Sequence, residues 1–109
     1  MGEVRAANEL DGKALLCNNK YEAAHPVIGL SFDGGKVSRH EVTGYSKIVK
    51  YQRTYWLVGT HGVNWVGNIS LNRETLRTNA GYQCSLSSKE EMNKKLDEII
   101  ATAKKKNKI

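Results

Sequence analysis

The residues best suited to chemistry lie on one predicted strand, Lys47–Val58. Tyr51, Arg53 and Tyr55 are spaced two apart, so their side chains share one face of this strand. Aromatic rings beside a guanidinium can stack exposed bases while the cation contacts phosphate, which is chemistry suited to nucleic acid. The alternative is that the tyrosines cover cross-strand neighbours in a small antiparallel sheet. Lys50 lies on the opposite face, so the positive charge is not gathered on one side.

A tryptophan, a histidine and three lysines extend this set of candidate binding residues. Trp56 precedes the Gly59–Gly62 turn and would anchor a protein partner if it is exposed. His61 lies at the tip of that turn. A predicted helix ends in lysines that could meet an acidic partner or nucleic acid, namely Lys104, Lys105 and Lys106. The structural alternatives are a tryptophan in a hairpin core, a histidine without a binding role, and a solvated helix end.

The sequence offers no recognisable catalytic or metal-binding set. None of the three histidines stands in a spaced pair with another ligand-type residue, and His40 and Glu41 point to opposite faces of a strand. Cys17 or Cys84 could meet a histidine in space, but neither carries a local signature of a nucleophile. We therefore predict no catalytic residues, no metal, no cofactor and no enzymatic activity.

The two cysteines bear on location. The segment Met1–Asp11 contains acids and no hydrophobic stretch, so it does not resemble a secretory signal. We expect a cytoplasmic protein with Cys17 and Cys84 as reduced, half-buried thiols. The alternative is one disulfide between an early and a late strand, which could contribute roughly 4 kcal/mol. No apolar run approaches the roughly 18 residues of a membrane-spanning helix, so we expect no membrane partner.

The elements that must position these residues are short strands separated by turn signals. Asp33-Gly34-Gly35 is a strong hairpin signal, because the tight turn needs positive φ and glycine adopts it readily. Alternating or β-rich runs predict the strands Ala14–Cys17, Val27–Phe32, Lys36–Thr43, Lys47–Val58, Val63–Leu71, Thr75–Thr78 and Tyr82–Leu86. Short connections between consecutive strands indicate an antiparallel meander.

The hydrophobic period changes after Ser88. Ser88 and Glu91 fit a capping box, in which the serine hydroxyl accepts a hydrogen bond from the glutamate N–H. An apolar stripe then recurs at helical spacing through Met92, Leu96, Ile99, Ile100 and Ala103. This pattern predicts an amphipathic helix over about 89–105 that packs over an open end or face of the sheet.

We therefore expect one mainly β (α+β) domain over residues 1–109. A polar lead-in, 1–12, precedes a curled β-meander or small barrel of six to seven strands over 14–86. The helix, 89–105, and a basic tail, 106–109, follow. The net charge is +6, and seven lysines against four acids in the last twenty-one residues carry half of that excess. A basic balance permits binding to nucleic acid or an acidic protein without requiring either.

Several short motifs together resemble small uncharacterised proteins of tailed bacteriophages. They are an early Leu-Leu-Cys, a Phe-Asp-Gly hairpin, the run Ile69–Leu76, a Tyr-Gln-Cys at 82–84 and a terminal Lys-Asn-Lys-Ile. The resemblance covers about residues 13–109 and implies a phage-encoded protein in the cytoplasm of an infected bacterium, or a minor virion part. It assigns no activity to any residue. A second likeness is to β-barrel inhibitors of C-type lysozyme, which are exported and lack this helix.

Three functional hypotheses follow. The first is a non-enzymatic binding module that binds or inhibits a host protein. The second is a nucleic-acid-binding accessory protein that uses the Tyr/Arg strand face and the basic tail. The third is a small-ligand binder or enzyme at a barrel mouth, with Cys17, Cys84 or His61 involved. The sequence does not give the oligomeric state or the strand order.

Overall fold

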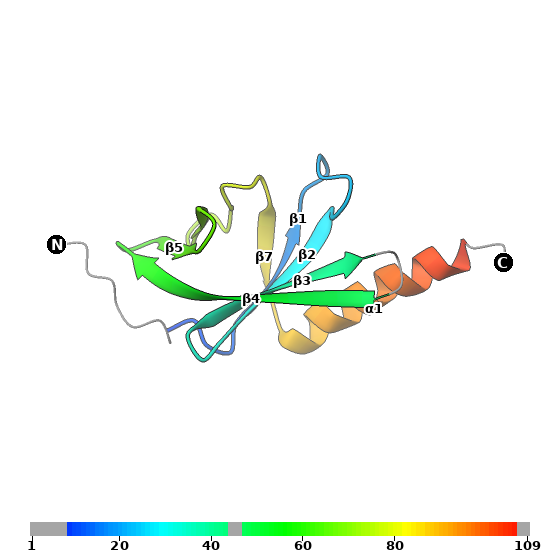
Figure 1. Cartoon of the computed structure of the whole chain (residues 1–109), viewed down its shortest axis with the longest axis horizontal. Coiled ribbons are helices and arrows are strands. Elements are labelled where there is room, and N and C mark those ends of the chain that lie inside the picture. Colours follow the sequence, from blue (N-terminus) through cyan, green and yellow to red (C-terminus); the bar gives the residue numbers. More distant parts are fainter. Residues whose placement is uncertain (1–8, 44–46, 107–109) are drawn as a thin grey trace.

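The described part of the chain contains seven antiparallel strands and one C-terminal helix, as predicted (Figure 1). The computed structural model describes residues 9–43 and 47–106, so most of the expected lead-in and of the basic tail lies outside the described residues. The elements are β1 (Ala14–Asn18), β2 (Val27–Asp33), β3 (Lys36–Thr43), β4 (Lys47–Val58), β5 (Gly62–Trp65), β6 (Ile69–Asn72), β7 (Gln83–Ser87) and α1 (Lys89–Lys105).

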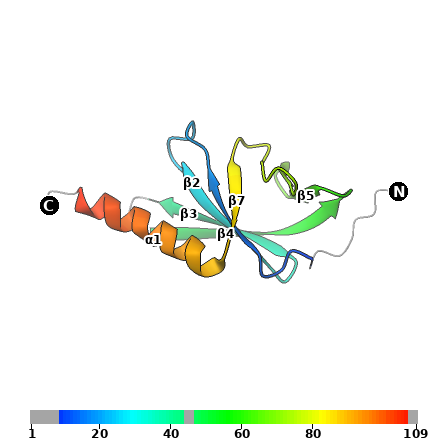
Figure 2. The same cartoon turned by 180° about the vertical axis from the view of Figure 1, so that it is seen from behind.

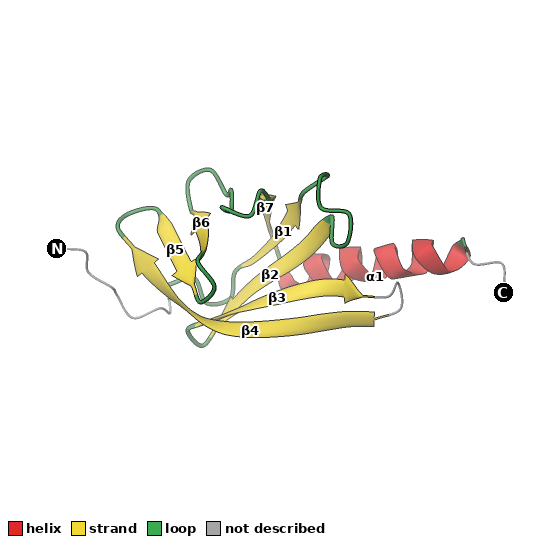
Figure 3. Ribbon diagram, turned by 45° about the horizontal axis from the view of Figure 1, so that its top comes forward, coloured by secondary structure: helices red, strands yellow, loops and turns green. Residues whose placement is uncertain are grey.

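The strands form one sheet in the order β6-β5-β4-β3-β2-β1-β7 (Figure 3). Each strand from β1 to β6 pairs with the next along the chain, and β7 returns to pair with β1. The sheet therefore curls into a half-barrel whose two outer strands, β6 and β7, face each other. Residues 76–78 partly bridge this gap, because the Cys84 N–H donates to the Leu76 carbonyl at 2.7 Å and Leu71 pairs with Thr78. We call the line between β6 and β7 the seam.

The main core fills the concave side of the curl. Every second residue of a strand points to this side, so β2 contributes Ile28, Leu30 and Phe32, all at most 2% exposed. Tyr55 from β4 lies among them, with its ring 5.1 Å from the Phe32 ring in an edge-to-face arrangement. Leu10, before β1, covers one end of this core.

The helix packs on the opposite face, over β1, β2 and β3 (Figure 2). Its first turn begins as predicted, since the Glu91 N–H donates to the Ser88 hydroxyl at 3.1 Å. Met92 and Leu96 are fully buried in a second, smaller cluster with Ala14. A side chain at Gly29 would lie 2.5 Å from the Met92 sulfur, so the glycine lets the helix approach the sheet closely.

Two of the predicted strands are wrong. Val63–Leu71 is not one strand but the hairpin of β5 and β6, because the chain turns at Gly67 and Asn68, both with positive φ. The period-2 pattern survives the turn because both strands present apolar residues to the same core. Thr75–Thr78 is not a strand either, although Arg77 and Thr78 make single bridges across the seam.

The expectation of two reduced cysteines is also wrong. Cys17 on β1 and Cys84 on β7 form a disulfide, and both residues are buried. They lie directly opposite each other because the curl brings the last strand beside the first. The cysteines are 67 residues apart in the sequence, so this adjacency is visible only in the strand order.

Candidate functional site

The first eight of the twelve residues of β4 form an open edge of the sheet. Residues 47–54 pair with β3 on one side, whereas β5 pairs only with residues 55–58. The Tyr55 N–H donates to the Gly35 carbonyl, on the β3 side. Because backbone groups alternate in direction along a strand, the N–H and C=O groups of the even-numbered residues point away from β3. These residues are Ile48, Lys50, Gln52 and Thr54.

Among the described residues, one side chain bonds to this open edge. The Arg53 guanidinium donates to the outward carbonyl of Gln52 at 2.9 Å. The remaining outward groups are free to bond to solvent or to another chain. We call residues 47–54 with these backbone groups the β4 edge.

The β4 edge is basic on both of its faces. Lys47 and Arg53 point to the concave side with Tyr51, and Lys50 points to the other side, so the predicted distribution of charge is confirmed. All three cations are exposed. In the described part of the chain, no carboxylate forms an ion pair with any of them.

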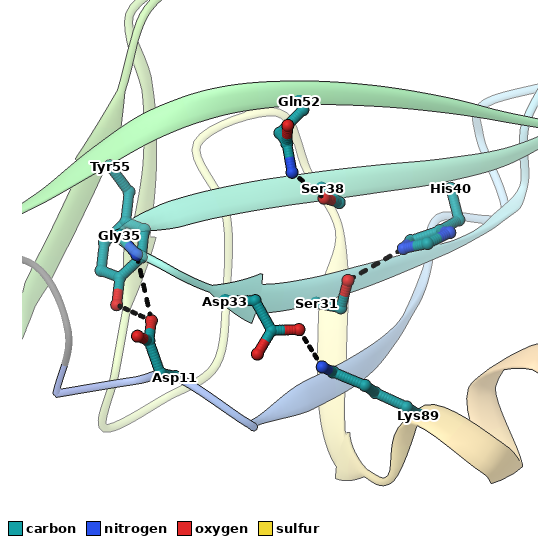
Figure 4. Close-up of polar contacts among 9 residues, drawn as sticks. All are labelled: Asp11, Ser31, Asp33, Gly35, Ser38, His40, Gln52, Tyr55 and Lys89. Atoms are coloured by element: carbon teal, nitrogen blue, oxygen red, sulfur yellow. Dashed lines mark hydrogen bonds and ion pairs between the residues drawn. The ribbon is translucent and has the colours of Figure 1, made fainter.

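The structure separates the two tyrosines of the predicted stacking surface. Tyr51 is 47% exposed, but Tyr55 is 1% exposed and belongs to the core. The Tyr55 hydroxyl accepts a hydrogen bond from the Leu10 N–H at 3.3 Å. It also donates to Asp11 at 3.4 Å (Figure 4). Burial is the largest cause that raises the pKa of Tyr55 above its ordinary value. A nucleobase can therefore stack on the Tyr51 ring but not on the Tyr55 ring.

The other predicted site residues are dispersed. Trp56 is half-buried on the face opposite Tyr55, facing Asn64 of β5. His61 lies in the turn before β5, with its Nε2 atom 3.8 Å from a Glu74 carboxylate oxygen. The three lysines occupy the exposed last turn and C-cap of α1. That helix end lies at the same end of the molecule's long axis as the start of β4 (Figures 1 and 2).

One serine–histidine pair that the sequence did not predict could take part in chemistry. Ser31 Oγ and His40 Nε2 share a hydrogen bond of 2.9 Å on the helix side of the sheet (Figure 4). Burial, and then the neighbouring Lys50, lowers the pKa of His40. Among the described residues, no carboxylate bonds to His40. Ser31 is buried, with 7% of its surface exposed. The arrangement disfavours protonation of the histidine, and within the described residues it lacks the third group that orients a catalytic base.

Metal ligands do not gather in the part of the chain that the structure describes. Within residues 9–43 and 47–106, no three His, Cys, Asp or Glu side chains converge on a position for a metal ion. In the same residues, no helix combines the length and apolarity that crossing a bilayer requires.

Comparisons with protein-family models, with curated proteins and with solved structures found no match to this chain. The likeness to phage proteins therefore stays a prediction, and the β4 edge has to be interpreted from its own chemistry.

Proposed function

We propose that the protein is a recognition module that binds an extended, acidic segment of a partner protein along the β4 edge. The observation that carries this proposal is the open part of β4, residues 47–54. Among the described residues, its outward backbone groups other than the Gln52 carbonyl have no partner, and its cations on both faces form no ion pair. Adding a strand to such an edge supplies affinity through backbone hydrogen bonds and specificity through alternate side chains.

The placement of the cations favours an added strand over nucleic acid. A strand that joins the sheet sends its side chains to both faces, so its acids can meet Lys47, Lys50 and Arg53 together. A nucleic acid lying on the concave face would reach Lys47 and Arg53 but not Lys50. It would also find one exposed tyrosine there, because Tyr55 is in the core.

The alternative to docking is protection. Lysines on an exposed edge also prevent unwanted pairing between sheets, and Arg53 already caps one outward carbonyl. The two interpretations differ in whether an acidic strand of matching register binds, so one experiment separates them.

The test uses a capped heptapeptide, acetyl-Glu-Thr-Val-Glu-Val-Thr-Glu-amide. Paired antiparallel, its three glutamates lie opposite Arg53, Lys50 and Lys47. We expect saturable binding by isothermal titration calorimetry, and this binding should weaken as salt is added because the charges are exposed. The same peptide with glutamine in place of glutamate should bind at least about tenfold more weakly. An eight-nucleotide oligothymidylate that binds more tightly than the heptapeptide would favour the nucleic-acid hypothesis instead.

Two pairs of variants assign the binding to the edge. Lys47→Gln, Lys50→Gln and Arg53→Gln combined should abolish it, whereas Lys104→Gln, Lys105→Gln and Lys106→Gln, with the same change in net charge, should retain it. Gln52→Pro removes an N–H that points outward, which an edge strand tolerates. Gln52→Ala keeps that N–H and should bind like the wild type. Equal binding by Gln52→Pro and Gln52→Ala would exclude strand addition.

The disulfide indicates the kind of compartment in which the protein would bind such a partner. Disulfides persist in oxidising compartments and are rare in the cytosol, so the Cys17–Cys84 bond favours an oxidising location over the cytoplasm. A host-cell protein remains the partner class implied by the resemblance to phage proteins. Maleimide labelling of the denatured protein from cells would decide the location, since a cytoplasmic chain should react at both thiols and an exported chain at neither.

A further inference from the structure

A groove opens along the seam where residues 76–78 stop bridging it. Its volume is about 250 Å³. Its floor is formed by buried side chains of the main core, namely Leu10, Leu15, Phe32 and Leu71. Leu76 and Leu86 form its sides, and Leu86 is 68% exposed although it belongs to the inner face of β7. Apolar side chains of the core thus line a groove that opens at the seam.

The backbone of Leu86 is open beside this groove. Cys84 and Leu86 both occupy positions whose backbone groups point away from β1, because the Cys84 N–H bonds to Leu76 across the seam. Leu86 follows Cys84 by two residues and therefore has its N–H and C=O groups on the same side of β7. In the described residues, neither its N–H nor its carbonyl has a partner across the seam. One unpaired donor and one unpaired acceptor therefore stand next to the apolar groove.

The charges at the rim are also unequal. Arg73 is neutralised by Glu9, with 2.9 Å between the guanidinium and the carboxylate. Lys13 is exposed at the same rim, and no described carboxylate pairs with it. The groove thus offers an apolar space, an open backbone pair and one free cation.

We propose that this groove binds an extended peptide segment of a partner through one large apolar anchor residue. A volume of 250 Å³ lies below the range of about 300–1,000 Å³ usual for small-molecule sites, and it suits a single side chain. The partner residue that pairs with Leu86 points to the same face of the sheet as Leu86, which is the face on which the groove opens. Backbone pairing and anchor insertion therefore occur at the same residue.

The site should also prefer an acidic residue at one position of the partner segment. A strand added antiparallel to β7 begins near Ser87, beside the end of β1 where Lys13 lies. The residue two positions before the anchor shares its face and points toward Lys13. The recognised pattern is therefore an acid, any residue, and a large apolar residue. Beyond the anchor the segment can continue for only a short way, because Leu76 closes the seam at Cys84.

This groove is separate from the β4 edge and does not depend on the proposed function there. The two sites recognise different sequences, since the β4 edge selects acids at every third position and the groove selects one apolar anchor. Failure of one experiment leaves the other site untouched, and each site's variants serve as controls for the other.

The test uses a fluorescein-labelled peptide, Asp-Thr-Trp-Ser with an amidated C-terminus, and measures its anisotropy with the intact, oxidised protein. We expect saturable binding that falls at least about tenfold when alanine replaces the tryptophan. Replacing the aspartate by asparagine should weaken binding severalfold at low salt and much less at high salt. In heteronuclear NMR spectra the Leu86 amide should shift most.

Matched variants locate the binding. Leu86→Pro removes the outward N–H at an edge position, which the sheet tolerates, and should abolish binding. Val66→Ser changes another exposed apolar residue, 60% exposed in the β5–β6 turn, and should leave binding intact. Lys13→Gln should remove the preference for aspartate over asparagine while keeping the preference for tryptophan.

Three results would overturn the proposal. They are equal binding of the tryptophan and alanine peptides, unchanged binding by a folded Leu86→Pro variant, and no saturable binding at all. Sedimentation of the protein alone tests whether a second copy of this chain occupies the groove instead. A concentration-dependent dimer that Leu86→Pro dissociates would assign the groove to a second copy of this chain and not to a partner.

Discussion

Cys17 and Cys84 stand directly opposite each other on β1 and β7, and a disulfide joins them. The Cys84 N–H points across the seam, so the pair occupies a position without backbone bonds between its two members. Opposing side chains approach most closely at such positions. The bond therefore fastens the last strand of the sheet to the first, next to the seam.

Breaking this bond should lower stability substantially. The disulfide closes a loop across a sequence separation of 67, for which chain entropy gives about 4 kcal/mol. A domain of this size has a free energy of unfolding of about 5–15 kcal/mol. We expect urea denaturation of the Cys17→Ala, Cys84→Ala double variant to show a loss of about this size. A reductant should weaken the wild type equally and leave the double variant unchanged, whereas a reductant without effect on the wild type would contradict the prediction.

The helix should contribute through its two buried side chains. Leu96 is completely buried between α1 and the sheet, so Leu96→Ala removes apolar contacts and leaves a cavity. Such changes cost about 2–5 kcal/mol. Lys94→Ala, on the exposed face of the same helix, should change stability by no more than about 0.5 kcal/mol. Thermal denaturation of both variants checks the prediction, and an unchanged melting temperature for Leu96→Ala would show that the helix does not dock.

The helix illustrates what the sequence alone could predict. Its start depends on Ser88 and Glu91, three residues apart, and its buried face on Met92 and Leu96, so every determinant is local. The alternation that put Tyr51, Arg53 and Tyr55 on one face is local as well, and it is confirmed. Features of this kind depend only on the period of the secondary structure.

The other features of the candidate site depend on neighbours that are distant in the sequence. Tyr55 packs against Phe32 and bonds through its hydroxyl to Leu10 and Asp11, which lie 45 and 44 positions earlier, whereas Tyr51 is exposed. The open part of β4 exists because β5 is only four residues long. The Ser31–His40 bond and the disulfide require the register and order of strands. No pattern within a single strand contains this information.

The two tyrosines of β4 should therefore differ sharply in their effect on stability. Tyr55→Ala removes a ring that packs against Phe32 and a hydroxyl that bonds to the Leu10 N–H, so we expect a loss of about 3–5 kcal/mol. Tyr51→Ala removes an exposed ring and should cost no more than about 0.5 kcal/mol. Urea denaturation measures both. Similar losses for the two variants would show that Tyr51 is packed and is not available at the β4 edge.

His40 gives the protein a predictable response to acid. Burial, and then repulsion by Lys50, holds its pKa below the ordinary value of about 6.5. The unfolded chain therefore binds a proton more readily than the folded one. The contribution of His40 to stability is fully present above the unfolded pKa and is lost as the pH falls through the folded pKa. Acidification below about pH 6.5 should thus lower the free energy of unfolding, and His40→Gln should flatten this dependence.

Replacing Lys50 isolates the smaller of the two causes. Lys50→Gln removes the repulsion but not the burial, so it should raise the pKa of His40 only part of the way to its ordinary value. Lys20→Gln changes an exposed cation in the β1–β2 connection by the same charge and should leave the His40 titration in place. An NMR titration of the His40 ring measures both variants. If the wild-type ring titrated above its ordinary range, or if Lys50→Gln left the titration unmoved, the packing of His40 against Ser31 would not be the one described.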